Sequence, residues 1–308
     1  MTLTRPGVTA ETLAANEVHR PTPSALFTTY GFKWPGFVIP YFDQNRDPIW
    51  DRGGRQYVRL RLDEPISRTD PETGKVEVRK YHQPYKSKLH IYLPKGFNAH
   101  YDDQLVIVEG ELKSLSLVEA GIPAVAVSGF YNFLTDGKLL PDFVDLLIDL
   151  KPKRLLFLGD SDTSHNALFS CAAVKMAQLV APIQVLLPRI PVDMPKGIDD
   201  VREELGSRFP RFWRDIVETA VPVAPSTCTK RLCLVLLERE IERIAHLSPV
   251  KKKELHPRMR KVGAFRRKVV KNPGASSEAL ATGRQVPTDP CASGGIATFL
   301  PGPVRRPR

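Results

Sequence analysis

The sequence is poor in cysteine, with four in 308 residues, and it has no CxxC pair. Cys228 and Cys233 are the closest two along the chain, and no second pair of candidate ligands lies near them. This pattern indicates free thiols in a reducing, cytoplasmic compartment rather than disulfides or a structural zinc site.

Long apolar runs are also missing. No stretch approaches the roughly 18 consecutive apolar residues of a membrane span. The first residues, MTLTRPGVTAETL, have no apolar signal-peptide core. There is no GxxxxGK[ST] motif, which excludes a P-loop motor. We therefore expect a chain that is neither secreted nor inserted in a membrane.

Acidic residues are scarce at one end of the chain. The formal net charge is +11, and residues 247–308 contain 14 Lys and Arg but three Asp and Glu. The first 246 residues are balanced, with 31 residues of each sign. Because Lys and Arg release counterions from phosphates, nucleic acid is a natural partner for this basic end. A solvated tail without a partner is the alternative.

The composition is otherwise that of a globular protein, with 42% apolar and 26% charged residues, which suffices for a sizeable core. Periodicity and turn signals divide the chain into five regions. They are a helical lead-in (1–35), a β-rich subdomain (36–98), an α/β region (99–210), a helical segment (211–250) and a basic, largely disordered tail (251–308).

The β-rich subdomain has four runs of β-branched and aromatic residues: FVIPYF, QYVRLRL, KVEVRKY and LHIYLP. In QYVRLRLD the apolar residues alternate with Tyr57, Arg59 and Arg61, which predicts one apolar face and one basic, aromatic face. DRGG and DPETG predict hairpin turns. We expect a mostly antiparallel sheet here.

Residues 99–210 contain four near-continuous apolar runs, LVIV, AVAV, RLLFL and IQVLLP, which are typical of strands buried on both faces. Helical patterns lie between them, over 112–120, 139–150 and roughly 165–180. This alternation predicts a parallel-centred sheet flanked by helices. The fold class is therefore α/β in this region and α+β over the whole chain.

Acidic residues follow three of these strand-like runs. Glu109 follows LVIV, Asp160 and Asp162 follow RLLFLG, and Asp199 and Asp200 lie in KGIDD after IQVLLP. Because the carboxyl ends of parallel strands meet at one edge, we expect these side chains along one rim. The alternative is that each aspartate caps a helix or lies in a turn.

A rim of carboxylates without His or Cys has the ligand chemistry that Mg²⁺ or Mn²⁺ prefers. Clustered carboxylates stay ionised only when cations compensate them. Such a site can clamp phosphates and stabilise charge in phosphoryl transfer.

The ordered motifs VIVEGELKSLSL, FLGDSD and KGIDD resemble a TOPRIM domain, the fold shared by bacterial-type primases, type IA and II topoisomerases and some nucleases. The resemblance covers residues 103–205 and is strongest to primase-like replication proteins of plasmids, phages and integrated elements. It implies that Glu109, Asp160 and Asp162 are catalytic. It also implies a magnesium or manganese site formed by Glu109, Asp160, Asp162, Asp199 and Asp200.

The preceding segment, from IPYFD to RKYHQPYKSKLHIYLP, is similar to the β-rich half of primase catalytic cores. That similarity implies contacts from basic residues to template and nucleotides, with a solvated basic strand face as the alternative. The expected contact residues are Arg59, Arg61, Lys80, Lys86, Lys88, Lys113 and Lys196.

The chain departs from the primase pattern at Lys113, where many primases have an acidic residue, so the number of metals stays open. No zinc-binding module precedes the core in this sequence. The motifs predict a magnesium-dependent primase-like enzyme that makes short primers on single-stranded DNA in mobile-element replication. Its expected partners are single-stranded DNA and nucleotides, with a replicative helicase or polymerase as a further candidate. A TOPRIM nuclease and a non-catalytic nucleic-acid-binding replication accessory protein are the alternatives.

Overall fold

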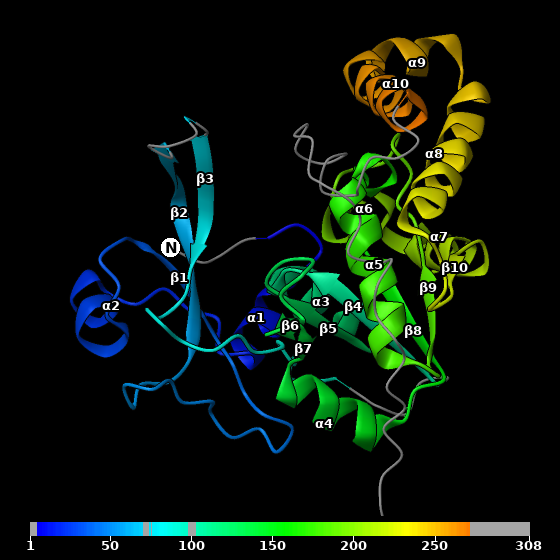
Figure 1. Ribbon diagram of the computed structural model, residues 1–308. Coiled ribbons are helices and arrows are strands. Elements are labelled where there is room, and N and C mark those ends of the chain that lie inside the picture. Colours follow the sequence, from blue (N-terminus) through cyan, green and yellow to red (C-terminus); the bar gives the residue numbers. More distant parts are fainter. Residues whose placement is uncertain (1–4, 70–73, 75, 98–102, 272–308) are drawn as a thin grey trace, which may run out of the picture.

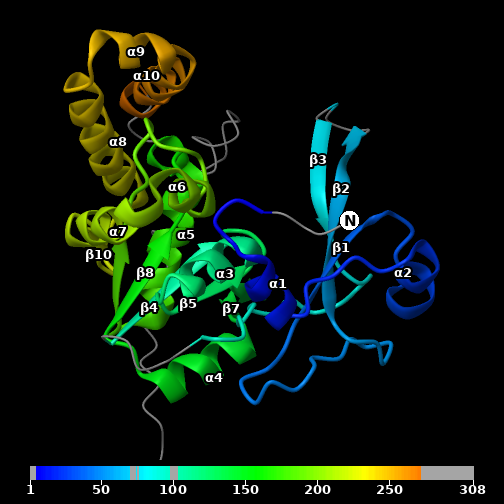
Figure 2. The ribbon, with the colours of Figure 1, turned by 180° about the vertical axis from the view of Figure 1, so that it is seen from behind.

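The computed structural model describes residues 5–69, 74, 76–97 and 103–271. A β-rich part and an α/β part lie side by side, and a group of helices extends from the α/β part (Figure 1). Figure 2 shows the same arrangement from behind, with helix α1 between the two parts. Within the described residues, no helix has both the length and the apolar character needed to cross a membrane.

The β-rich part begins with two short helices, α1 (Ala10–Ala15) and α2 (Pro23–Tyr30). The Thr9 side chain accepts a hydrogen bond from the Thr12 backbone N–H and so caps α1, in keeping with the predicted helical lead-in. Helix α2 ends at Gly31, whose φ of 75° lies in the left-handed region that glycine adopts without strain.

The antiparallel sheet of this part has the order β1-β2-β3, with bounds Gly36–Pro40, Val58–Thr69 and Val76–His82. Turn DRGG is closed by a hydrogen bond from the Asp51 N–H to the Arg55 carbonyl, at 2.7 Å. The DPETG turn lies outside the described residues except for Gly74.

The prediction of a fourth strand over LHIYLP is wrong. It forms a single bridge, from Tyr92 to Ala126 at the edge of the α/β sheet. Pro94 has no backbone N–H with which to continue a ladder.

The α/β sheet has the order β10-β9-β8-β4-β5. Strands β4 (Gln104–Glu109), β5 (Ala124–Val127), β8 (Arg154–Leu158) and β9 (Gln184–Leu187) are parallel, and β10 (Val221–Val223) is an antiparallel edge strand. This arrangement confirms the predicted parallel-centred sheet. Strands β4, β5 and β8 are buried as predicted, but β9 is only partly buried, because Gln184 is exposed and Leu186 is half-buried. A short hairpin, β6 (Leu134–Thr135) and β7 (Lys138–Leu139), follows β5.

Helices cover both faces of this sheet because its central strands have apolar side chains on both sides. One core lies between the sheet and helices α4 (Pro141–Leu150) and α5 (Ala167–Val180). The other lies against α3 (Glu111–Glu119), α6 (Ile198–Leu205) and α7 (Phe209–Glu218). Two 3₁₀ helices, η1 (Thr163–His165) and η2 (Gly206–Arg208), complete the connections.

Three further helices follow: α8 (Thr229–Ala245), α9 (Pro249–Glu254) and α10 (His256–Lys271). The helical segment therefore continues past residue 250, where the sequence predicted a largely disordered tail. Residues 251–271 are ordered because Leu255, Val262 and Val269 are buried. The rest of the predicted tail, residues 272–308, lies outside the described residues.

Candidate functional site

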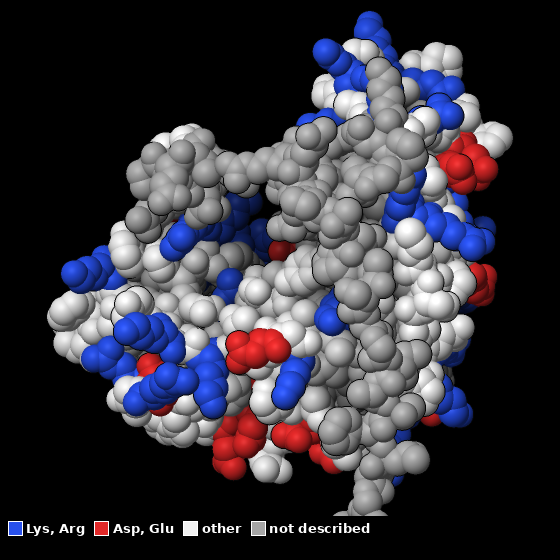
Figure 3. Space-filling view, viewed as in Figure 1, with Lys and Arg blue, Asp and Glu red and all other residues white. Residues whose placement is uncertain are grey.

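A pocket of about 600 Å³ opens at the carboxyl ends of β4 and β8 and faces the β2–β3 hairpin. Its basic lining residues are Arg5, Arg59, Arg61, Arg79, Lys80, Lys113 and Lys196, and its acidic ones are Glu109, Asp160, Asp199 and Asp200. Figure 3 shows Lys and Arg atoms inside this recess, with acidic atoms at its floor. The pocket thus has a small acidic floor and a larger basic wall.

The acidic floor is formed where two neighbouring parallel strands end. Glu109 is the last residue of β4, and Asp160 follows β8 after a single glycine. Strands β4 and β8 pair in register, so these carboxylates are brought to the same edge. The prediction of a common rim is therefore confirmed for Glu109 and Asp160, and Asp162 is joined to Asp160 through a shared lysine.

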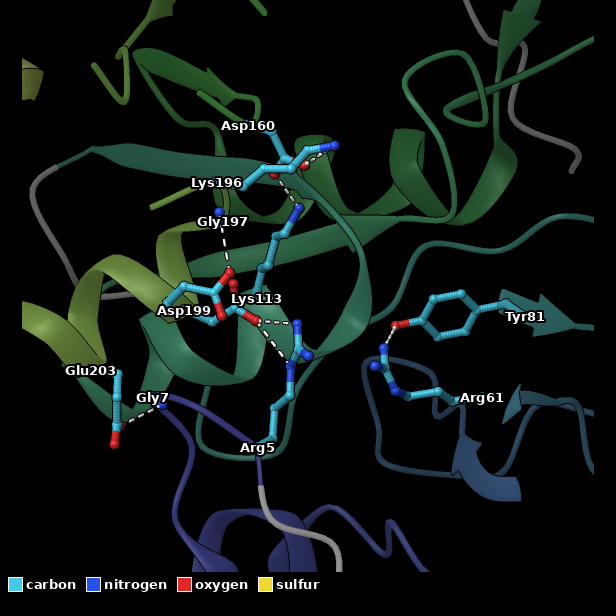
Figure 4. A network of polar contacts seen from close by, with 11 residues as sticks. Arg5, Gly7, Arg61, Tyr81, Lys113, Asp160, Lys196, Gly197, Asp199 and Glu203 are labelled. Carbon is cyan, nitrogen blue, oxygen red and sulfur yellow. Dashed lines mark hydrogen bonds and ion pairs between the residues drawn. The ribbon is translucent and has the colours of Figure 1, made fainter. Parts of the chain in front are cut away.

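Two lysines neutralise this floor (Figure 4). The Lys113 Nζ contacts Oδ1 of Asp160. The Lys196 Nζ lies 3.6 Å from Oδ2 of Asp160 and 3.1 Å from Oδ2 of Asp162. Lys196 is 61% exposed at its side chain, whereas Lys113 is only 18% exposed. Lys113 is thus a fixed part of the site, and Lys196 is free to exchange its partners for others.

Burial raises the pKa of Glu109 above its ordinary value. The nearby Lys113 ammonium opposes the rise, and the charge of Asp160 adds to it. This carboxyl therefore holds a proton more readily than an exposed glutamate, which suits a group that exchanges protons.

This shift gives a pH-dependent effect of Glu109→Gln on stability. As pH rises, the unfolded carboxyl ionises first, near its usual pKa of about 4.3. The folded one ionises at higher pH, so the wild type loses stability between the two values. The neutral variant avoids this loss. Its stability relative to the wild type should rise with pH through this window, as measured by urea unfolding at pH 4 to 8. A difference independent of pH would contradict the assignment.

The other two predicted metal ligands have partners within the protein. Asp199 is fully buried and accepts hydrogen bonds from Arg5, at 2.8 Å from Nη2 and 3.1 Å from Nε. Asp200 accepts a long hydrogen bond, at 3.4 Å, from the Gly197 N–H at the start of α6. Asp200 therefore has the helix-start role that was its alternative. The role of both residues as metal ligands stays a prediction.

Gly197 allows these groups to approach closely. A Cβ atom at this position would lie 2.3 Å from Oδ1 of Asp199 and 3.2 Å from Cε of Lys113. Any larger residue would therefore displace the side chains that form the pocket floor. The sequence shows a glycine in KGIDD, but it does not reveal this close approach.

Arg59 has a structural partner that the sequence did not indicate. Its Nη1 lies 2.5 Å from Oε1 of Glu111, and the Tyr41 hydroxyl donates to the same oxygen at 2.6 Å. Glu111 is fully buried at the first position of α3, so this pair joins the β-rich part to the α/β part. Burial works against the charge of Arg59, but Glu111 outweighs it and raises the pKa of the guanidinium. The alternative that Arg59 lies on a solvated strand face is therefore wrong.

A second pocket, of about 1050 Å³, continues from the first and shares Arg59, Arg79 and Tyr81 with it. We call it the aromatic trough. Trp34 stacks on His82 there, with ring centroids 4.4 Å apart and planes at 7°.

Further along the aromatic trough, Tyr85 is 88% exposed and the Lys86 Nζ lies 5.2 Å from its ring centroid. Exposed rings next to cations are what single-stranded nucleic acids stack upon.

The remaining predicted contacts are divided between these pockets. Arg61 and Lys80 line the first, where Arg61 donates to the Tyr81 hydroxyl at 2.8 Å (Figure 4). Lys86 lines the aromatic trough, and Lys88 is exposed and lines neither. Sequence reasoning missed Arg5, Arg79, Tyr81 and Glu111.

The acidic side chains match the ligand chemistry of Mg²⁺ but not the geometry of a site made of protein ligands alone. Glu109, Asp160 and Asp162 supply oxygens only, as that ion prefers. Among the described residues, however, no three His, Cys, Asp or Glu side chains lie close enough to hold a metal. Lysines already occupy oxygens of Asp160 and Asp162. The residues therefore fit an ion held by one or two carboxylates together with substrate phosphates, and do not fit a cage of protein ligands alone.

No protein-family profile matches this chain, and neither does any curated protein sequence. Among solved structures, the chain is similar to the RNA polymerase domain of the primase DnaG from Mycobacterium tuberculosis. The TM-score is 0.36 and the sequence identity 15%, over 77% of this chain and 70% of that one. A similarity this low carries no functional argument, so the function is argued from the site.

Proposed function

We propose that this protein is a primase-like nucleotidyltransferase that joins nucleotides on a single-stranded DNA template. One observation carries the proposal. The carboxylates of Glu109 and Asp160 line one pocket at the carboxyl edge of a parallel sheet, and basic residues of the β2–β3 hairpin line the same pocket. Asp162 is linked to Asp160 through Lys196, which contacts both carboxylates. Phosphoryl transfer requires this pairing of acidic groups for a cation with basic groups for phosphates.

In this proposal the basic wall binds phosphates. Arg61 is oriented by its hydrogen bond to Tyr81, and Lys80 is exposed beside it. Lys196 can move from Asp160 and Asp162 to a nucleotide phosphate, because its side chain is exposed.

The acidic floor supports the chemical step. Mg²⁺ (or Mn²⁺), when bound by Asp160 and Asp162 with substrate phosphates, would neutralise charge that develops on the transferred phosphoryl group. Glu109 would accept the proton of the attacking hydroxyl, since its raised pKa makes it a better base than an exposed carboxylate. The hydroxyl oxygen would bond to the α-phosphorus of the incoming nucleoside triphosphate as the α–β phosphoanhydride bond breaks, and pyrophosphate would leave. Lys113 would stay beside Asp160 and hold its orientation. The sequence motifs suggest that the reaction serves mobile-element replication.

The aromatic trough would hold the unpaired template. Trp34→Leu and Tyr85→Leu should each weaken single-stranded DNA binding by about 1–3 kcal/mol, or roughly 5- to 150-fold in Kd, because each removes a stacking surface. Fluorescence anisotropy with a labelled oligonucleotide measures this change.

Trp50→Leu is the matched control for these two variants. Trp50 is 62% exposed but does not line the trough. Equal losses for all three variants would remove the trough from the proposal.

The proposal is tested on one denaturing gel. The protein is incubated with labelled single-stranded DNA, differently labelled nucleotides and Mg²⁺ or Mn²⁺. The expected result is new product that carries the nucleotide label. Shortened template without such product would instead assign a nuclease.

A second candidate function has its own supporting observation. Lys113 and Lys196 compensate the acidic floor without any metal. This favours a non-catalytic nucleic-acid-binding accessory protein. In that case the gel shows no change in either label, while the protein retains the DNA.

A further inference from the structure

Helix α10 is a fixed part of the α/β half. Val262 and Val269 on its inner face are almost completely buried. Arg258, near its start, donates to the backbone carbonyls of Val192 and Met194 at 2.7 and 2.9 Å. The helix is therefore held both by apolar packing and by hydrogen bonds to the chain between β9 and α6.

Its contacts place α10 beside both loops that form the acidic floor. It packs against η1, which begins at the residue after Asp162. Val192 and Met194 precede Lys196 in the loop between β9 and α6. In Figures 1 and 2, α10 and the β2–β3 hairpin rise from the same end of the molecule, on opposite sides. Any nucleic acid that extends from the pocket toward α10 would meet this helix.

The outer face of α10 is strongly basic. Residues 249–271 contain ten Lys and Arg against one Glu, and α10 itself contains no acidic residue. Arg260, Lys261 and Arg267 are exposed and form no hydrogen bond or ion pair with other residues that the structure describes. Figure 3 shows Lys and Arg atoms gathered over the part of the molecule that α9 and α10 form in Figure 1. Their positive charge is thus available to a partner.

The chemistry of this face favours a duplex over a single strand. The two helices contain one Phe, Tyr or Trp residue, Phe265, which is partly buried and packs against the core. Single strands bind through stacking on exposed rings such as Trp34 and Tyr85 of the aromatic trough, whereas α10 has no exposed Phe, Tyr or Trp. A duplex presents one phosphate charge per about 1.7 Å, and a 16-residue helix spans about 24 Å beside it.

We propose that the outer face of α10, through Arg260, Lys261 and Arg267, binds the phosphate backbone of double-stranded nucleic acid. That this duplex is the template–product hybrid leaving the pocket rests on the proposed function. The binding itself does not depend on it.

The test compares two triple variants of the full chain. Arg260→Gln/Lys261→Gln/Arg267→Gln removes three charges from α10. Lys138→Gln/Lys151→Gln/Lys153→Gln removes three exposed charges near β7, α4 and the start of β8, at the far end of the molecule (Figure 1). Binding of a labelled 20-base-pair DNA duplex and of a labelled single strand is measured by anisotropy at several salt concentrations. Circular dichroism checks that each variant is folded.

For the α10 variant, the slope of log K for the duplex against log salt should become less steep by about 3, or about 1 per lost contact. The single-strand affinity should change much less, and the control variant should match the wild type. Equal slopes for both triple variants would overturn the inference. Failure of the wild type to bind the duplex would also overturn the inference and would make an acidic protein the candidate partner of this face.

The Asp160→Asn/Asp162→Asn variant separates this inference from the proposed function. It should bind the duplex at least as well as the wild type does, whether or not the wild type makes product. If no product forms but the α10 variant still loses duplex binding, the proposed function fails and the inference holds.

Discussion

The Asp160→Asn/Asp162→Asn variant should lose nucleotide incorporation by at least about 10²–10³-fold while it keeps its affinity for nucleic acid. Both substitutions remove charge from the groups that would hold a cation against substrate phosphates. They also release Lys196 from its two carboxylate partners, so its charge becomes available to phosphates. Product formation should therefore fall, while DNA binding should be at least as strong as that of the wild type. Primer gels and anisotropy on the same preparation measure both.

A matched pair of aspartates on α4 provides the control. Asp145 and Asp149 are exposed and do not line the candidate pocket. Asp145→Asn/Asp149→Asn removes the same charge and should leave incorporation unchanged. Full incorporation by the Asp160→Asn/Asp162→Asn variant would contradict a catalytic role for these residues. Parallel loss of DNA binding would indicate that the substitution disrupts the fold around Lys113.

Glu111→Gln should destabilise the protein by about 3–5 kcal/mol, because it leaves the charge of Arg59 buried without its counterion. Arg59 and Glu111 have side chains that are 10% and 0% exposed, and the Tyr41 hydroxyl also depends on Glu111. At roughly 2–4 °C per kcal/mol for a chain of this size, Tm should fall by about 6–20 °C. Urea unfolding and thermal melts followed by circular dichroism measure the two quantities.

An exposed ion pair sets the baseline for this effect. The side chains of Asp103 and Lys153 lie 2.5 Å apart and are 54% and 75% exposed. Asp103→Asn should cost no more than about 1 kcal/mol. The double variant Arg59→Met/Glu111→Leu removes both buried charges and should be less destabilised than Glu111→Gln alone. A cost for Glu111→Gln as small as that for Asp103→Asn would show that water reaches this pair.

Local patterns were enough to predict the sheet and its acidic edge. The four parallel strands coincide with the near-continuous apolar runs. Parallel pairing of β4 and β8 then brings Glu109 and Asp160 to the same edge of the sheet. The hydrogen-bond partners of the polar side chains could not be predicted from local patterns. Arg5 and Asp199 are 194 positions apart in the sequence, and no motif around either residue indicates that they pair.

Sequence patterns alone were misleading in two segments. Arg59 alternates with apolar residues as an exposed strand residue would, but Glu111 makes its burial possible. Residues 251–271 were assigned to the basic, largely disordered tail (251–308), although the composition rich in Gly, Pro, Ser and Ala that predicts disorder begins only after Asn272. Their few apolar residues, Leu255, Val262 and Val269, lie at helical spacing and are sufficient to anchor them on the α/β half. The partner of a buried polar residue, and the docking of a helix through a few apolar residues, both depend on tertiary contacts, which composition does not encode.

The contact between Arg5 and Asp199 also fixes when the pocket can be completed during protein synthesis. Translation proceeds at about 5–20 residues per second, so Arg5 leaves the ribosome about 10–40 s before Asp199 does. A similar interval separates the synthesis of Gly7 from that of Glu203, whose carboxylate accepts a hydrogen bond from the Gly7 N–H at 2.9 Å. A nascent chain therefore carries the basic hairpin and most of the acidic floor before its first residues can dock. The assembled pocket is a late product of translation, and until then both charged surfaces are open to other partners.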